Sequence, residues 1–123
     1  MAVLLVTSNK SRRLLCVSYI GRMRPEEFQR SHEQLMAQLG EMSPGFCLLV
    51  DFSHLEFIGL DCQPELGRMM GLIGRAGVGW VARVIPDPSK DIGMNILTAF
   101  HYPHRFPVVT CKSLVEAARA LGL

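Results

Sequence analysis

The stretch Phe46-Cys47-Leu48-Leu49-Val50 decides the fold class of this chain. Five apolar residues in a row are typical of a strand that is covered on both faces of a sheet. The next four residues, Asp51-Phe52-Ser53-His54, bring in three polar side chains, and we expect the strand to end there. Strands of this kind belong mostly to parallel sheets with helices packed on their faces, so the stretch predicts an α/β protein.

Strands and helices alternate on both sides of this stretch. Short apolar runs predict the strands, and apolar residues spaced three and four apart predict the helices. Proline near a helix start and glycine near a helix end support the boundaries. In chain order the predicted elements are strands 3–7 and 14–20, helix 25–39, strand 46–50, helix 61–76, strand 80–85, helix 88–102, strand 107–111 and helix 113–121.

This order, β-β-α-β-α-β-α-β-α, predicts a single domain over residues 1–123. We expect about five strands in a mostly parallel sheet, with an antiparallel N-terminal strand pair and four helices. A chain of 123 residues, 49% of them hydrophobic, buries enough surface to fold without a disulfide or a metal.

Charge and hydropathy exclude some classes of partner. With 13 basic and 11 acidic residues the net charge is +2, which does not indicate a nucleic-acid-binding protein. No apolar run approaches the roughly 18 residues of a membrane span, and the N-terminus lacks the basic leader of a signal peptide. We therefore expect a cytoplasmic protein without a membrane span.

The four cysteines do not form a metal-binding or disulfide pattern, because none belongs to a C-x-x-C pair. We expect them to be reduced, and Cys16 and Cys47 to be buried in apolar runs. Cys62 is predicted at the start of a helix, where backbone N–H groups stabilise a thiolate. It is the one thiol that we expect to be reactive.

Polar residues gather at the predicted carboxyl ends of the parallel strands, where open α/β sheets bind ligands. Carboxylates beside a lysine on that edge suit a magnesium ion or a phosphate. The alternative is structural, since Asp61 and Asp87 would cap helices and Asp51 would close a turn. No spacing matches a metal signature, so we predict no metal and no cofactor. The residues of this possible ligand or anion edge are Asp51, Ser53, Asp87, Lys90 and Asp91.

The predicted helix 61–76 has an unusual composition on one face. Gly67, Gly71 and Gly74 share a side and leave a smooth strip that is flanked by Arg68 and Arg75. We interpret the strip as a surface for a partner or a second copy; the alternative is that the helix merely tolerates its glycines. The residues predicted to face the core from the same helix are Leu66, Met69, Met70 and Ile73.

The segment 48–58, LLVDFSHLEFI, resembles the central strand and loop of STAS domains, the anti-sigma-factor-antagonist or SpoIIAA-like proteins. Their pattern is an apolar strand, Asp-x-Ser, an apolar residue, Phe-Ile and then a helix. The predicted order of elements also matches their fold, and residues 113–121 are similar to their last helix. The likeness is to the uncharacterised SpoIIAA-like branch, and it implies the fold and a protein-binding helix start.

One departure from the family pattern concerns its phosphorylation site. Regulatory members have Asp-Ser-Ser-Gly after Phe-Ile, and a partner kinase phosphorylates the second serine. Here the four residues are Gly59-Leu60-Asp61-Cys62, so Asp61 stands where the resemblance places the phosphoserine. Asp61 either imitates a permanently phosphorylated state or only caps the following helix.

We therefore expect a non-enzymatic interaction or regulatory module that binds another protein or a second copy of itself. One alternative is a carrier of a small apolar molecule or lipid, since the fold is similar to that of CRAL-TRIO domains and the chain is rich in methionine. The other is an enzyme or a metal site at the strand ends, which no nucleophile elbow or phosphate-binding loop supports. The predicted partner-binding residues are Gly59, Leu60, Asp61, Cys62, Pro64, Arg68, Gly71 and Arg75.

Overall fold

Five strands form one sheet in the structure, a computed structural model that describes residues 2–85 and 107–123. The order of the strands across the sheet is their order along the chain. β1 runs antiparallel to β2, and all other neighbouring strands are parallel. The bounds are β1 Ala2–Asn9, β2 Leu14–Met23, β3 Cys47–Ile58, β4 Trp80–Val84 and β5 Val108–Cys111.

Three α-helices accompany the sheet in the described residues, and the predicted α/β architecture is confirmed for that part of the chain. They are α1 (Pro25–Gly40), α2 (Gln63–Arg75) and α4 (Leu114–Ala120), and a short 3-10 turn, η1 (Leu60–Cys62), precedes α2. The helix predicted over 88–102 lies outside the described residues. Within residues 2–85 and 107–123, no helix is both long enough and apolar enough to cross a membrane.

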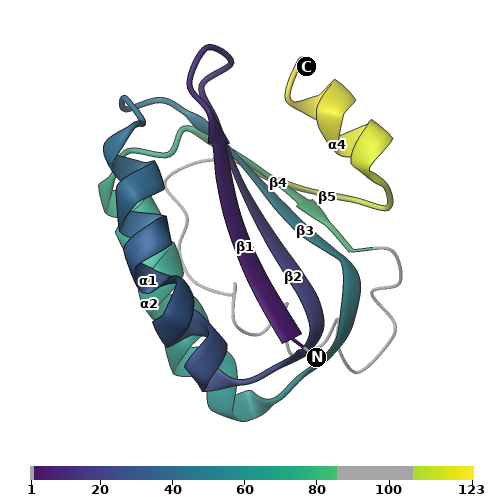
Figure 1. The fold of residues 1–123 in the computed structure, drawn as a ribbon. Coiled ribbons are helices and arrows are strands. Elements are labelled where there is room, and N and C mark those ends of the chain that lie inside the picture. The colour runs from purple at the N-terminus through teal and green to yellow at the C-terminus, as the bar shows by residue number, and fades with distance from the viewer. Residues whose placement is uncertain (1, 86–106) are drawn as a thin grey trace.

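The helices lie in two layers, one on each side of the sheet (Figure 1). α1 connects β2 to β3 and α2 connects β3 to β4, so both are crossovers between adjacent parallel strands. Because such crossovers are right-handed, both helices fall on the same face. α4 packs on the opposite face, against β4 and β5.

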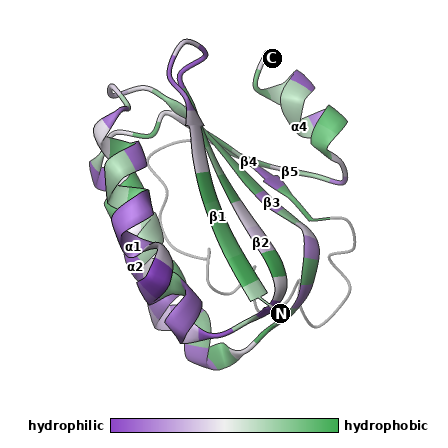
Figure 2. Ribbon diagram, viewed as in Figure 1, coloured by the Kyte–Doolittle hydropathy of each residue, from purple (hydrophilic) through white to green (hydrophobic). Residues whose placement is uncertain are grey.

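The main core lies between the sheet and the layer of α1 and α2. Hydrophobic residues run along the strands in Figure 2, whereas α1 carries strongly hydrophilic residues on its visible side. At the centre, the ring of Tyr19 stacks on Phe52 with centroids 4.9 Å apart and lies 5.9 Å from Phe28. The Tyr19 hydroxyl donates a hydrogen bond to Sδ of Met69 (3.2 Å). This cluster joins β2, β3, α1 and α2.

α1 also protects the edge strand β1. Ser31, buried in α1, donates a hydrogen bond from its hydroxyl to the carbonyl oxygen of Leu4 (2.9 Å). Towards the other end of the strand, the Ser8 hydroxyl donates to the side-chain oxygen of Gln38. Covering an edge strand with a helix is one way in which proteins prevent unwanted strand pairing.

The prediction that the central strand ends at Val50 is wrong, because β3 continues to Ile58. The Asp51 carboxylate accepts hydrogen bonds from the backbone N–H (2.9 Å) and the hydroxyl of Ser53. These bonds make a turn inside the strand rather than at its end. The polar residues after Val50 therefore mark an irregularity that the strand passes through.

β2 likewise continues past Gly21, the residue predicted to end it. Gly21 is buried and has a φ of +81°, a conformation that glycine reaches without strain. The six residues Ser18–Met23 of β2 lie opposite the eight residues Asp51–Ile58 of β3, with two register shifts between them. β3 therefore bulges twice, and bulges bend a strand and redirect its side chains. β4 ends opposite Asp51, so the last part of β3 extends beyond it.

Candidate functional site

The loop after β3 and the first turn of α2 together hold five of the residues for which we predict partner binding. Gly59 precedes η1 in an extended conformation, and the backbone N–H of Cys62 donates to its carbonyl oxygen (3.1 Å). Cys62 is the N-cap of α2, and Pro64 lies in the first turn of that helix. Proline suits this position because the first N–H groups of a helix have no partner within it. α2 thus begins at Gln63 rather than at residue 61 as predicted.

Asp61 does not cap α2, so the capping alternative for this residue is wrong. Neither η1 nor α2 has a side-chain hydrogen bond at its N-cap. The Asp61 carboxylate turns back over Gly59 instead, since a Cβ atom built on that glycine would lie 2.6 Å from Oδ1. The 3-10 turn explains the difference: it places Asp61 inside a helical turn and not at the position that precedes one.

Two large apolar side chains are exposed around this loop. Leu60 is 65% exposed and Phe57, at the end of β3, is 42% exposed. The guanidinium carbon of Arg22 lies 5.0 Å from the centroid of the Phe57 ring, at the distance of a cation–π contact. We call Arg22, Phe57, Leu60 and Asp61 the η1 surface.

Sequence reasoning missed two members of the η1 surface, Phe57 and Arg22. They are direct partners in the ladder between β2 and β3. That pairing exists only because both strands continue past their predicted ends. The available signal was the return of apolar residues after Ser53, namely Leu55, Phe57 and Ile58, of which Leu55 and Ile58 are buried.

The prediction that Cys62 is a reactive thiol is wrong. Its side chain is fully buried, and Sγ lies 3.7 Å from the carbonyl oxygen of Met23. Burial above all, and then the negative charge of Asp61, raise the pKa of this thiol to about 11. In this buried position the loss of water outweighs the favourable field of the helix start.

This burial predicts how Cys62 reacts. At pH 8 we expect no labelling of Cys62 by a disulfide reagent in the folded protein and rapid labelling in denaturant, read by mass spectrometry of the peptides. The half-buried Cys47 serves as the control and should react first. The raised pKa also means that folding favours the thiol. This contribution to stability is complete below pH 9.0, the ordinary pKa, and is lost as the pH rises towards about 11. Labelling of Cys62 at the rate of Cys47 at pH 8 contradicts the burial.

The side of α2 that faces away from the sheet carries the remaining partner-binding residues. Gly67, Arg68 and Arg75 are exposed, and Gly71 and Gly74 are half-buried. The Arg68 guanidinium donates to the Glu65 carboxylate (2.7 Å). The predicted core residues of the helix are buried, which confirms its inward face: Leu66, Met69, Met70 and Ile73.

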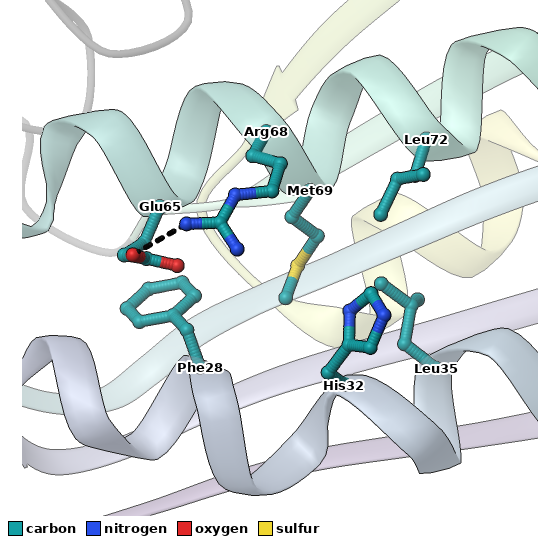
Figure 3. Close-up of a pocket in the computed structure, with 7 residues that line it drawn as sticks. All are labelled: Phe28, His32, Leu35, Glu65, Arg68, Met69 and Leu72. Carbon is teal, nitrogen blue, oxygen red and sulfur yellow. Dashed lines mark hydrogen bonds and ion pairs between the residues drawn. The ribbon is translucent and has the colours of Figure 1, made fainter.

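The seam between α1 and α2 is nearly closed (Figure 3). Its cavity of about 20 Å³ has a mostly apolar floor that includes Phe28, Leu35 and Met69, with His32 and Arg68 at the rim. This volume holds about one water molecule. The seam is therefore a packed helix–helix contact and not a ligand pocket.

Only part of the predicted ligand or anion edge lies in the described residues. Asp51 and Ser53 hydrogen-bond to each other at the first bulge of β3, opposite the end of β4. Asp87, Lys90 and Asp91 lie outside the described residues. Among residues 2–85 and 107–123, no three histidine, cysteine or acidic side chains come together in a way that could hold a metal ion.

A larger hollow lies beside the two bulges. Its volume is about 510 Å³, and it is lined by Ile20 and Gly21 of β2 and by residues 53–56 of β3. The lining combines apolar groups with a hydroxyl, an imidazole and a carboxylate. The hollow is a shallow depression that is broadly open to solvent, so it can cover one side of a small molecule but does not enclose it.

Comparison with known proteins identifies the fold. No family model matches the chain, and no curated protein matches it. An uncharacterised protein of the DUF3478 family from Shewanella loihica PV-4, solved with a SpoIIAA-like fold, superposes with a TM-score of 0.74 at 13% identity, over 98% of this chain and 95% of that chain. The anti-sigma factor antagonist SpoIIAA in its unphosphorylated form gives a TM-score of 0.63 at 17% identity, over 98% of this chain and all of the other. The chain therefore has the SpoIIAA-like (STAS) fold.

Proposed function

We propose that this chain is a non-enzymatic interaction module of a regulatory kind, which binds a partner protein through the η1 surface and the exposed side of α2. The observation that carries the proposal is the exposure of Leu60 (65%) in η1 and of Phe57 (42%) at the end of the preceding strand, β3. Exposed aromatic and aliphatic side chains rimmed by charges are typical of protein contact sites. Here Arg22 and Asp61 supply the charged rim, and Arg68 and Arg75 extend it along α2.

The chemistry of the loop favours binding over catalysis. Its one nucleophile, Cys62, is buried and held as a thiol. The groups that the η1 surface presents to solvent are an isobutyl chain, an aromatic ring, a carboxylate and a guanidinium. These groups recognise a surface but do not by themselves transfer an atom or a proton.

The likeness to an anti-sigma factor antagonist supports a regulatory role by analogy of fold, which is a weaker argument than the site itself. Asp61 occupies the place where the sequence resemblance puts a phosphoserine. A carboxylate carries one negative charge at neutral pH, where phosphoserine carries about two. We therefore propose that this module presents a fixed charge and is not switched by a kinase at this position.

The test compares the proteins captured from a lysate by matched variants. We expect Leu60→Asp to reduce the amount of each specifically captured protein at least about tenfold, because it puts an unpaired charge into the centre of the contact. Met36→Asp is the matched control, since Met36 is 44% exposed but lies on α1, away from the loop. It should leave capture unchanged.

Equal capture by the wild type and by Leu60→Asp would contradict the proposal.

Asp61→Ser in the same assay tests the fixed charge. Because Asp61 caps no helix, we expect this substitution to change the free energy of unfolding by less than about 0.5 kcal/mol. A change in the amount of captured protein then shows that the charge of Asp61 takes part in binding. Unchanged capture shows that it does not, and the fixed charge is then no part of the proposed function.

The hollow beside the bulges favours a second candidate function, the binding of a small amphipathic molecule. Native mass spectrometry of the purified protein, with a denatured control, tests it. A reproducible noncovalent adduct of a few hundred daltons, lost in Ile20→Trp, supports this function. Spectra without an adduct argue against it.

A further inference from the structure

Met69 is a buried methionine that borders a small opening in the surface. It lies on the inward face of α2 and is 5% exposed. Its side chain points from α2 towards α1 and lines the seam cavity of about 20 Å³ (Figure 3). The rim of this cavity carries the exposed residues His32 and Arg68. A small molecule that passes this rim therefore meets the thioether of Met69.

A hydrogen bond fixes the position of the Met69 sulfur. The Tyr19 hydroxyl donates to Sδ over 3.2 Å, and the Tyr19 ring is itself buried and stacked on Phe52. A methionine side chain is flexible and normally adapts to its surroundings, but here a rigid donor holds it. The bond uses one of the two lone pairs of sulfur. Within residues 2–85 and 107–123, no second donor uses the other.

The size of the cavity decides which oxidants can reach this sulfur. Its volume of about 20 Å³ holds about one water molecule. Hydrogen peroxide is uncharged and larger than water by a single oxygen atom, so a small movement of the exposed rim side chains admits it. A hydroperoxide with a branched alkyl group is several times larger and does not fit. The seam therefore selects the smallest peroxide.

We propose that Met69 is a modification site at which hydrogen peroxide oxidises the buried thioether to the sulfoxide. The unused lone pair of Sδ attacks one oxygen of the peroxide, so that an S–O bond forms and the O–O bond breaks. The departing oxygen keeps the electron pair of the O–O bond, takes the proton from the transferred oxygen and leaves as water. Sulfur loses two electrons in this step, and the peroxide gains them.

The seam also has room and hydrogen-bond donors for the product. The sulfoxide adds one oxygen atom to the side chain, and the cavity beside it has the volume of about one water molecule. A buried sulfoxide oxygen is a polar acceptor that needs a donor. The Tyr19 hydroxyl lies on the core side of Met69, and the Arg68 guanidinium and the His32 imidazole lie at the rim. The oxidised side chain can therefore stay inside the folded protein.

The other methionines of the described residues provide internal controls. Met36 is 44% exposed on α1. Met70 and Met23 are 4% and 3% exposed, close to the value for Met69, but neither lines the seam cavity. Exposure alone predicts that Met36 reacts and that the three buried methionines are equally protected. The proposal instead separates Met69 from Met70 and Met23.

The test treats the folded protein with hydrogen peroxide and measures the oxidation of each methionine by peptide mass spectrometry. We expect Met69 to react at least about tenfold faster than Met70 and Met23, and more slowly than Met36. Met69 and Met70 share the tryptic peptide 69–75, so fragment ions between them assign the oxygen. In denaturing urea these four methionines should react at similar rates, which controls for their intrinsic reactivity.

A second oxidant and a variant test the route through the seam. With tert-butyl hydroperoxide we expect Met36 to be oxidised and Met69 to be as slow as Met70, because the alkyl group does not enter the cavity. Leu72→Phe places a larger side chain in the cavity lining and should slow the reaction of Met69 with hydrogen peroxide at least about fivefold. Gly67→Ala, on the same helix but outside the lining, should leave the rate unchanged. Circular dichroism melting checks that both variants are folded.

Equal oxidation rates of Met69 and Met70 in the folded protein overturn the proposal, because the oxidant then enters by unfolding and not through the seam. Equal preference for Met69 over Met70 with both oxidants also overturns it, since the cavity then does not select by size. This inference goes beyond the interaction module proposed above, because it uses neither the η1 surface nor the exposed side of α2. None of these results bears on partner capture.

Discussion

Replacing Phe52 with alanine is expected to lower the free energy of unfolding by about 3–5 kcal/mol, the usual cost of removing a buried phenylalanine. Phe52 is 3% exposed, and its ring stacks on Tyr19 at 4.9 Å. The substitution leaves a cavity at the point where β2, β3 and both inner helices meet. Urea unfolding, followed by circular dichroism, measures the change.

Phe57 provides a matched control on the same strand. It is 42% exposed, and its clearest partner is Arg22 above the ring. We expect Phe57→Ala to cost about 1 kcal/mol or less, which includes the cation–π contact. The contrast tests the length of β3 directly. If the strand ended at Val50, as the sequence alone predicts, both rings would lie in an irregular segment and the two substitutions would have similar costs.

Gly77→Ala is expected to lower the free energy of unfolding by about 2–4 kcal/mol, for two separate reasons. Gly77 has a φ of +98°, which an L-residue with a side chain adopts only under strain. A Cβ atom at this position would also lie 2.9 Å from Cβ and 3.0 Å from Cα of Pro44. The Cα atom belongs to the backbone and cannot move aside as a flexible side chain can.

Gly67→Ala should have the opposite sign. Gly67 lies in α2, and a Cβ atom there would meet nothing within 4 Å. Alanine favours a helix over glycine by about 1 kcal/mol, so we expect a gain in stability of that order. Equal effects of the two substitutions on the urea midpoint would contradict the placement of Gly77 in the turn after α2. The variant is also informative in the capture assay, because it adds a methyl group to the smooth strip of α2.

The order of the elements could be predicted because it depends on local patterns. Continuous apolar runs predicted the buried strands. Pro25 opens the helix that it was predicted to open, and Pro64 lies in the first turn of the next helix, as predicted. Ser113 accepts a hydrogen bond from the backbone N–H of Glu116, as their spacing predicts. Each of these signals lies within one helical turn or one strand, so it can be recognised from a short segment of sequence without knowledge of the fold.

The length of β3 could not be predicted in the same way. Asp51 and Ser53 have the side chains of a turn, and they do form a turn, but inside a strand that continues through it. The residues that decide between a turn and a bulge lie on β2, about 30 positions earlier, where Ser18 and Ile20 keep the ladder paired across the irregularity. The turn-forming character of Asp51 and Ser53 was therefore interpreted correctly, but the position of this turn inside a continuing strand was not predicted.

For the candidate site, the position of the loop in the chain could be predicted, but the side chains that form its exposed surface could not. The sequence pointed to residues 59–64 through a family pattern, yet it predicted a reactive thiol at Cys62 and omitted Arg22 and Phe57. The burial of Cys62 follows from the 3-10 turn, which rotates the thiol beneath the loop towards Met23. A rotation of this kind depends on where the preceding strand ends, and that depends on the ladder.

By itself, the sequence determined the α/β class, the alternation of strands and helices, the inward face of α2 and the loop that follows the central strand. These properties follow from hydrophobic periodicity, which can be read from a few consecutive residues and does not depend on which other segments pack against them. The tertiary structure alone decided the register of β3 on β2, the burial of Cys62, the pairing of Arg22 with Phe57 and the side of the sheet that α4 covers. Those are contacts between segments 30 or more positions apart, and their geometry arises only when the sheet has formed.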